Sequence, residues 1–180
     1  MNILLVNPPY VGGYKKLTID LPQMGLAYLA SALRQDGHNV QIADLNLGKK
    51  ELPSRFSDFG LVGITSDTPR NPLALNIASK AKQYNLPVAM GGPHVSFMPE
   101  EALQTGVVDY IARGEGEYIF QSLAKHLENN LELEGVPGLS FKQGGLHLAA
   151  QYEVVTNGIE VDDADLTDDG EYPKDGYFVD

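Results

Sequence analysis

Short apolar segments alternate with segments of helical periodicity along most of the chain. The apolar runs are bounded by Gly, Pro or Asp, as buried parallel strands usually are, and they cover residues 3–6, 40–43, 61–65, 88–90 and 107–112. Between them, helical patterns cover residues 24–33, 73–84, 99–105 and 119–127. The helix at 24–33 is apolar on nearly every side, which predicts that it is pressed between the sheet and another layer. Only a turn or two is expected between the second and third strands.

This alternation predicts an α/β fold, because parallel neighbouring strands need right-handed crossovers that place helices over the sheet. We expect a flavodoxin-like (Rossmann-like), doubly wound, five-stranded parallel sheet of order 2-1-3-4-5 over residues 1–133. Residues 134–161 predict a small C-terminal β-hairpin extension, with Asn157-Gly158 as a tight-turn pair. Residues 162–180 combine low hydrophobicity with high charge and predict an acidic linker or tail.

The charge of the 180-residue chain is concentrated at one end. Its formal net charge is −11, but residues 159–180 hold nine acids and one base, so the remaining 15 acids and 12 bases leave residues 1–158 near neutrality at −3. With no basic stripe to neutralise phosphates, neither duplex nucleic acid nor an anionic membrane surface is an expected partner. The start of the chain has no basic segment before its four apolar residues, which predicts neither a signal peptide nor a membrane span. We therefore expect a cytoplasmic protein.

The sequence contains no cysteine. This excludes disulfides, thiolate zinc sites, cysteine nucleophiles and an iron–sulfur cluster held by this chain.

Candidate binding residues lie in the loops that follow the first, third, fourth and fifth strands. Ligands of doubly wound sheets bind at the carboxyl ends of strands, and glycines there let a ligand approach the backbone closely. Any single Gly-rich loop can be only a turn, but four on one edge indicate a wide platform. The candidate residues are Pro9, Tyr10, Val11, Gly12, Thr65, Ser66, Asp67, Thr68, Gly91, Gly92, His94, Gly114, Glu115 and Gly116.

Common nucleotide sites match these loops poorly. The segment "GEGEY" follows the last strand instead of the first, and its two glutamates would repel a pyrophosphate. A phosphate-binding loop with Gly-Lys-Ser/Thr is missing, as is the acidic pair that a response-regulator receiver needs after its first strand.

Five segments carry a family resemblance in their order and spacing. They are "LLVNPPY", "LPQMGLAYLASALRQDGHNVQIADLN", "LVGITSDT", "AMGGPHVSFMPEEAL" and "VDYIARGEGE". Together they resemble the amino-terminal cobalamin-binding domain of class B (cobalamin-dependent) radical SAM proteins, in the group of the anaerobic magnesium-protoporphyrin IX monomethyl ester cyclases. The resemblance covers residues 2–142, and the combination of "GGPH" with "RGEGE" is its most specific part.

The resemblance implies a cobalamin cofactor whose corrin lies across the carboxyl edge of the sheet. The nucleotide tail would enter beside the third and fourth strands, with Thr65 and Ser66 offering hydroxyls and Gly91 and Gly92 leaving room. The cobalt would be held by the corrin alone, base-off, because the loop "NPPYVGGYKK" has no histidine; His94 is expected to contact a loop or the tail. S-adenosylmethionine and an iron–sulfur cluster would belong to a downstream radical SAM domain, a methyltransferase or anaerobic cyclase, that is absent from this chain.

A second hypothesis is a non-catalytic interaction or regulatory flavodoxin-like domain that no longer binds cobalamin. A flavin or nucleotide enzyme of the same fold is disfavoured by the missing phosphate loop. The sequence predicts no catalytic dyad, triad or protein metal site in this chain.

Overall fold

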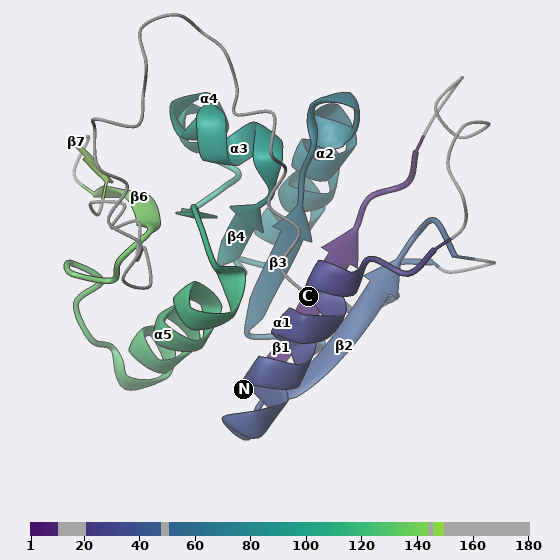
Figure 1. The fold of residues 1–180 in the computed structure, drawn as a ribbon, viewed down its shortest axis with the longest axis horizontal. Helices are drawn as coiled ribbons and strands as arrows, with labels where there is room; N and C mark the ends of the chain where they lie inside the picture. The colour runs from purple at the N-terminus through teal and green to yellow at the C-terminus, as the bar shows by residue number, and fades with distance from the viewer. Residues whose placement is uncertain (11–20, 48–50, 144–145, 150–180) are drawn as a thin grey trace, which may run out of the picture.

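A seven-stranded sheet of order β2-β1-β3-β4-β5-β6-β7 forms the centre of the protein in the computed structural model (Figure 1). The structure describes residues 1–10, 21–47, 51–143 and 146–149. The first five strands in sequence are parallel to their neighbours, and β6 and β7 continue the sheet antiparallel. The strands are β1 (Asn2–Asn7), β2 (Asn39–Asp44), β3 (Leu61–Thr65), β4 (Val88–Gly91), β5 (Tyr110–Ala112), β6 (Leu139–Gln143) and β7 (Leu146–Ala149).

Helices cover both faces of this sheet. One face carries α1 (Met24–Gln35) and α5 (Gly116–Asn129), which lie in front in Figure 1. The other face carries α2 (Asn71–Lys82), α3 (Pro93–Phe97) and α4 (Pro99–Gln104). Single 3-10 turns occur at η2 (Phe56–Asp58) and η3 (Thr68–Arg70).

Two apolar clusters, one on each face, hold these layers together. Leu4 and Val6 of β1 pack with the α2 side, whereas Ile3 and Leu5 pack with the α1 and α5 side. Successive side chains of a strand point to opposite faces, and because both faces are covered, residues 3–7 are buried without interruption. This explains why the strands appear in the sequence as continuous apolar runs.

The structure confirms the predicted α/β class and the strand order 2-1-3-4-5. It also confirms the short helix near residue 99 and the single turn between the second and third strands. The fifth strand is shorter than predicted, because Asp109 bonds to Val88 through both its main chain and its side chain before regular strand pairing begins. Asp109 N donates to Val88 O over 2.9 Å, and Val88 N donates to Asp109 Oδ2 over 2.8 Å.

The surroundings of the helix α1 differ from those predicted. Leu26, Leu29 and Leu33 are buried against the sheet, but Met24 and Tyr28 are 56% and 62% exposed. Nothing among the described residues therefore forms a layer over the outer side of this helix.

The predicted hairpin extension is observed in part. Strand β6 pairs with β5, so the hairpin enlarges the main sheet instead of forming a separate unit. Residues 150–161, with the Asn157-Gly158 turn, and the acidic segment 162–180 lie outside the described residues, so the proposed domain boundaries stay predictions.

None of the helices in the described part of the chain is long and apolar enough to span a membrane.

Gly92 is required by the close packing of two loops. Its φ is +106°, and a Cβ there would lie 2.6 Å from the carbonyl oxygen of Ser66. We expect Gly92→Ala to lower the free energy of unfolding by more than about 2 kcal/mol, because the strained φ and the contact with backbone add. Chemical denaturation of the ligand-free protein measures this loss.

Gly106→Ala is the matched control. Gly106 also has a positive φ, +72°, but its Cβ would meet no atom within 4 Å. Its loss of stability should be confined to about 1–2 kcal/mol of backbone strain. Equal losses for the two variants would contradict the role assigned to the contact with Ser66.

Candidate functional site

A cavity of about 330 Å³ opens at the carboxyl edge of the sheet, between α1, α5 and the strands β3, β4 and β5. The two helices are tied together away from this edge, where Gln121 Nε2 of α5 donates to Ala32 O (3.2 Å) and Asp36 Oδ2 (2.8 Å). The cavity is lined by Gln23, Gly25, Leu26, Leu29, Gly63, Ile64, Thr65, Gly91, Gly92, Pro93, Ala112, Gly114, Glu115, Gly116, Glu117 and Phe120.

Small residues create this hollow. Thr65, Gly91 and Ala112 are register partners on adjacent strands, so a row of small side chains crosses the sheet at its carboxyl edge. On the helices, a Cβ added to Gly25 or Gly116 would meet no atom within 4 Å. Protein interiors are normally filled to high packing density, so unfilled space beside two glycines and a row of small residues is typical of a ligand site.

The chemical character of the cavity changes with depth. Its buried walls are apolar, formed mainly by Leu26, Leu29 and Phe120. Its polar side chains are less buried and lie near the opening: Glu115 is exposed and Thr65 is half-buried. A ligand with an apolar end and a polar stem fits this distribution.

A second hollow of about 510 Å³ adjoins the first one. It shares Gly92, Pro93, Gly114 and Glu115 with the cavity and extends to Phe97. The loops that follow β4 and β5 therefore form a continuous recessed surface along this edge.

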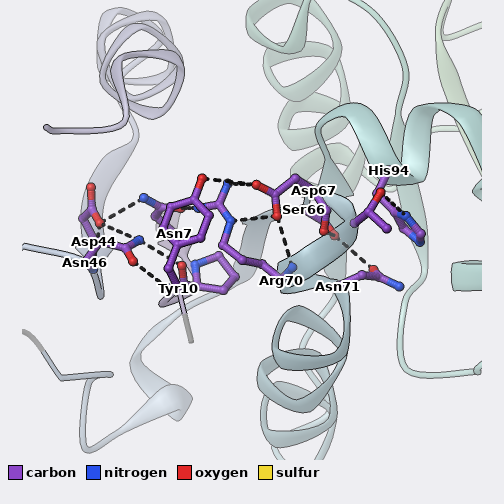
Figure 2. A network of polar contacts seen from close by, with 11 residues as sticks. Asn7, Tyr10, Asp44, Asn46, Ser66, Asp67, Arg70, Asn71 and His94 are labelled. Atoms are coloured by element: carbon purple, nitrogen blue, oxygen red, sulfur yellow. Dashed lines mark hydrogen bonds and ion pairs between the residues drawn. The ribbon is translucent and has the colours of Figure 1, made fainter. Parts of the chain in front are cut away.

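The other half of the edge is filled by a polar network around Arg70 (Figure 2). The guanidinium is 6% exposed and makes a two-pronged ion pair with Asp67, Nε to Oδ1 over 2.9 Å and Nη2 to Oδ2 over 2.8 Å. Its third nitrogen donates to Asn7 Oδ1, and Cζ lies 4.2 Å from the centre of the Tyr10 ring. The Tyr10 hydroxyl donates to Asp67 Oδ2 over 3.2 Å. The network thus joins the loops after β1 and β3.

Asp44 extends this network toward α1. Its Oδ1 accepts from Asn7 Nδ2 (2.9 Å) and from the backbone of Asn46 (3.0 Å), and its Oδ2 accepts from the backbone of Gln23 (3.3 Å). Asn46 Oδ1 in turn accepts from Tyr10 N over 2.7 Å. These bonds fix the start of the loop that follows β1.

The ionisation of the network follows from its burial and charges. Burial raises the pKa of Tyr10, and the neighbouring carboxylate adds to this effect. Burial alone would also raise the pKa of Asp67, but the hydrogen bonds and the positive charge of Arg70 together outweigh it and lower that pKa. Asp67 is therefore a carboxylate with its oxygens already engaged, which suits a structural role better than ligand binding.

The structure brings part of the predicted site together at the cavity. Six of the predicted residues line it: Thr65, Gly91, Gly92, Gly114, Glu115 and Gly116. Six others lie along the same edge without lining it: Pro9, Tyr10, Ser66, Asp67, Thr68 and His94. Val11 and Gly12 lie outside the described residues.

The structure engages the Ser66 hydroxyl inside the protein and places His94 against the loop after β3, which is one of the two contacts expected of it. The Ser66 side chain is fully buried and its hydroxyl donates to Asn71 Oδ1 over 3.0 Å, so it is engaged inside the protein. His94 lies in α3 rather than in a loop; its Nδ1 is 3.2 Å from Thr68 Oγ1, and its Nε2 is 3.8 Å from a carboxylate oxygen of Glu101.

Sequence reasoning missed the contribution of α1 and the residue before it, of three sheet residues and of three residues of α3 and α5. The missed lining residues are Gln23, Gly25, Leu26, Leu29, Gly63, Ile64, Pro93, Ala112, Glu117 and Phe120. Gly25 inside an apolar helix and Gly63 inside an apolar strand were the available signals, since glycine is unfavourable in both elements unless something must approach closely.

Fold and site together define an α/β ligand-binding domain with a hollow at the carboxyl edge of its sheet. Residues 13–124 match the B12-binding domain family, and the chain belongs to this family. This confirms the predicted cobalamin-binding class.

Relatives and solved structures agree with this assignment. The chain is 39% identical over 154 residues, 81% of its length, to an uncharacterised methyltransferase of Pyrococcus horikoshii. It is 29% identical over 154 residues, 79% of its length, to an anaerobic magnesium-protoporphyrin IX monomethyl ester cyclase of Synechocystis. The radical S-adenosylmethionine methyltransferase TsrM from Kitasatospora setae, solved with cobalamin and a [4Fe-4S] cluster bound, superposes with a TM-score of 0.71 and 26% identity over 86% of the chain.

The chain spans about a third of the length of these relatives, 33%, 31% and 29% respectively. The matched region is therefore one part of proteins that contain more than this domain.

The ion pair of Asp67 with Arg70 should make stability depend on pH. Asp67→Asn leaves a buried guanidinium without its counter-charge. We expect the free energy of unfolding at pH 7 to fall by about 1–3 kcal/mol, which is less than for a fully buried ion pair because a quarter of the Asp67 side chain is exposed to water. Because the pKa of Asp67 is lowered in the folded protein, its contribution is present above the usual value of about 3.9 and is lost as the pH falls through the lower folded-state value. Urea titrations at neutral and acidic pH should show the gap to wild type narrowing with acid.

Asp58→Asn is the control, because Asp58 forms an exposed ion pair of the same spacing with Arg55. Its loss should stay within about 0.5 kcal/mol at either pH. A gap for Asp67→Asn that is constant or widens in acid would contradict the assigned role of the carboxylate.

Proposed function

We propose that this chain is the cobalamin-binding domain of a radical SAM methyltransferase or anaerobic cyclase, and that it binds the cofactor base-off with the nucleotide tail in the cavity between α1 and α5. The observation that carries the proposal is the hollow itself. Gly25 and Gly116 line the cavity with no atom within 4 Å of an added Cβ, and Gly91 lines it from the sheet, so the space between the two helices and the sheet stays unfilled.

The residues present fit the two ends of such a tail. A base-bearing ring system can occupy the apolar region of Leu26, Leu29 and Phe120, and polar stem atoms can meet the hydroxyl of Thr65 near the opening. The carboxylate of Glu115 at the opening accepts hydrogen bonds, which suits the amide groups around a corrin and opposes a ligand with several phosphates.

The same geometry supports the base-off state. A base that occupies the cavity cannot reach the cobalt at the same time. Among the described cavity-lining residues there is no histidine, and His94 is turned toward Thr68 and Glu101. Both features support a metal that receives no imidazole from the protein. Cobalamin held in this way supplies a cobalt centre for alkyl transfer or radical chemistry.

Exposed apolar side chains support a further protein partner at this edge. Leu21, Met24 and Tyr28 project beside the start of α1, Tyr118 beside the start of α5 and Phe97 beside the second hollow, and each is more than half exposed. Grouped apolar exposure on this scale is typical of an interaction surface. The remaining two thirds of the full-length protein, a radical SAM domain with S-adenosylmethionine and an iron–sulfur cluster, would cover this surface.

The alternative of a regulatory domain that has lost its cofactor is disfavoured by the cavity. Without a ligand, side chains at Gly25 and Gly116 would improve the helices at no steric cost.

Binding of cobalamin should give a base-off absorption spectrum in the desalted complex. In the reduced Co(II) form, electron paramagnetic resonance should lack the splitting that an axial nitrogen produces, in wild type and in His94→Ala alike. A base-on spectrum, or nitrogen splitting that disappears in His94→Ala, would overturn the proposed coordination.

Filling the opening should block binding without harming the fold. In Gly25→Leu the added side chain has open space around its Cβ, and leucine is a better helix former than glycine. We expect its affinity for cobalamin to fall at least about tenfold, the factor for roughly 1.4 kcal/mol, with a free energy of unfolding at or above that of wild type.

Ala27→Leu, two residues along the same helix, is the control. Ala27 is also exposed but does not line the cavity, so its affinity should match wild type. If Gly25→Leu bound cobalamin as tightly as Ala27→Leu, the tail would not pass this glycine.

A further inference from the structure

The inner end of the cavity offers no hydrogen-bonding side chain. The cavity reaches Gly63, two residues before the end of β3, and Phe120, one turn into α5. A Cβ at Gly63 would lie 2.7 Å from the Phe120 ring and 2.8 Å from Leu5 Cδ2, so the ring rests directly on the glycine backbone and closes the cavity. Leu29 of α1 completes this end.

The backbone at this depth is also unavailable to a ligand. Gly63 lies between β1 and β4, with Leu5 as its register partner on one side and Ala89 on the other. The N–H and C=O groups beside Gly63 therefore bond to the neighbouring strands on both sides and are not free to bind a ligand. The polar side chains of the lining, Gln23, Thr65, Glu115 and Glu117, come from the ends of elements near the opening.

From this distribution we propose that the cavity selects the lower base of the corrinoid, and that it favours an alkylated benzimidazole over a purine. The inference rests on the proposed function and deepens it. The dimethylbenzimidazole of cobalamin presents methyl groups at its outer edge, and these match Leu29 and Phe120. Adenine in the same place presents an amino group and ring nitrogens, which would lose water and find no partner.

The preference is measurable as a ratio of two dissociation constants. The complete chain is titrated with cobalamin, with the cobamide that carries adenine as its lower base, and with cobinamide, which lacks the nucleotide tail; binding is followed by absorption. We expect cobalamin to bind roughly tenfold or more tightly than the adenine cobamide, the factor that one unpaired buried polar group produces. Equal affinity for the two cobamides would overturn the inference.

Variants of α1 and α5 test whether the inner end of the cavity causes the ratio of the two dissociation constants. Leu29→Gln places an amide at the inner end, where it can pair with a purine, so the ratio should fall severalfold. Leu127→Gln is the control, because Leu127 is a partly buried leucine on the same face of the sheet but does not line the cavity. It should keep the wild-type ratio, and a fall of similar size in both variants would overturn the inference.

The outcomes separate this inference from the proposed function. Tight binding of both cobamides with equal affinity overturns only the preference for the base. Affinity for cobalamin no greater than for cobinamide shows that the tail makes no use of the cavity and overturns both. Absence of binding by every corrinoid likewise overturns both.

Discussion

The close approach of two backbones, at Ser66 after β3 and at Gly92 after β4, determines the shape of the carboxyl edge. Ser66 N donates to Gly91 O over 2.8 Å, and His94 N donates to Ser66 O over 3.3 Å, so the sheet pairing continues past the last strand residues. Because Gly92 has no side chain, α3 can start at once and turn away from the edge. The space on the opposite face, toward α1 and α5, is left free for the cavity.

The two halves of the carboxyl edge are built differently. Beside β1 and β3, Arg70 and Asp67 fill the edge with charges that satisfy one another, and Tyr10 covers them (Figure 2). Beside β4 and β5, glycines leave the edge open. A buried guanidinium is costly unless it is paired, and here Asp67 and Asn7 satisfy it, so the closed half of the edge is filled without an unpaired charge.

The fold could be predicted from the sequence because each element carries its own signal. Continuous apolar runs identify strands covered on both faces, and the 3.6-residue period identifies the helices between them. The cavity was predictable only at its edge, where Gly91 and Gly116, at the end of β4 and the start of α5, belong to segments that the sequence predicts as loops. Gly25 and Gly63 lie inside regular elements, and their meaning depends on what faces them: Gly25 faces open space, whereas Gly63 supports the Phe120 ring. The partner of Arg70 across the sheet, Asn7, likewise depends on the tertiary arrangement.

An open cavity has a cost in stability that the rest of the domain must offset. Each missing side chain forgoes dispersion contacts with the apolar walls around it. The helices α1 and α5 are nevertheless kept at a fixed separation. Gln121 of α5, next to the cavity-lining Phe120, joins them by bonding to Ala32 and Asp36 at the C-terminal end of α1, and buried leucines anchor both helices on the sheet. The hollow is therefore held open by contacts that lie outside it, and a ligand that enters gains the apolar contacts without first having to separate the helices.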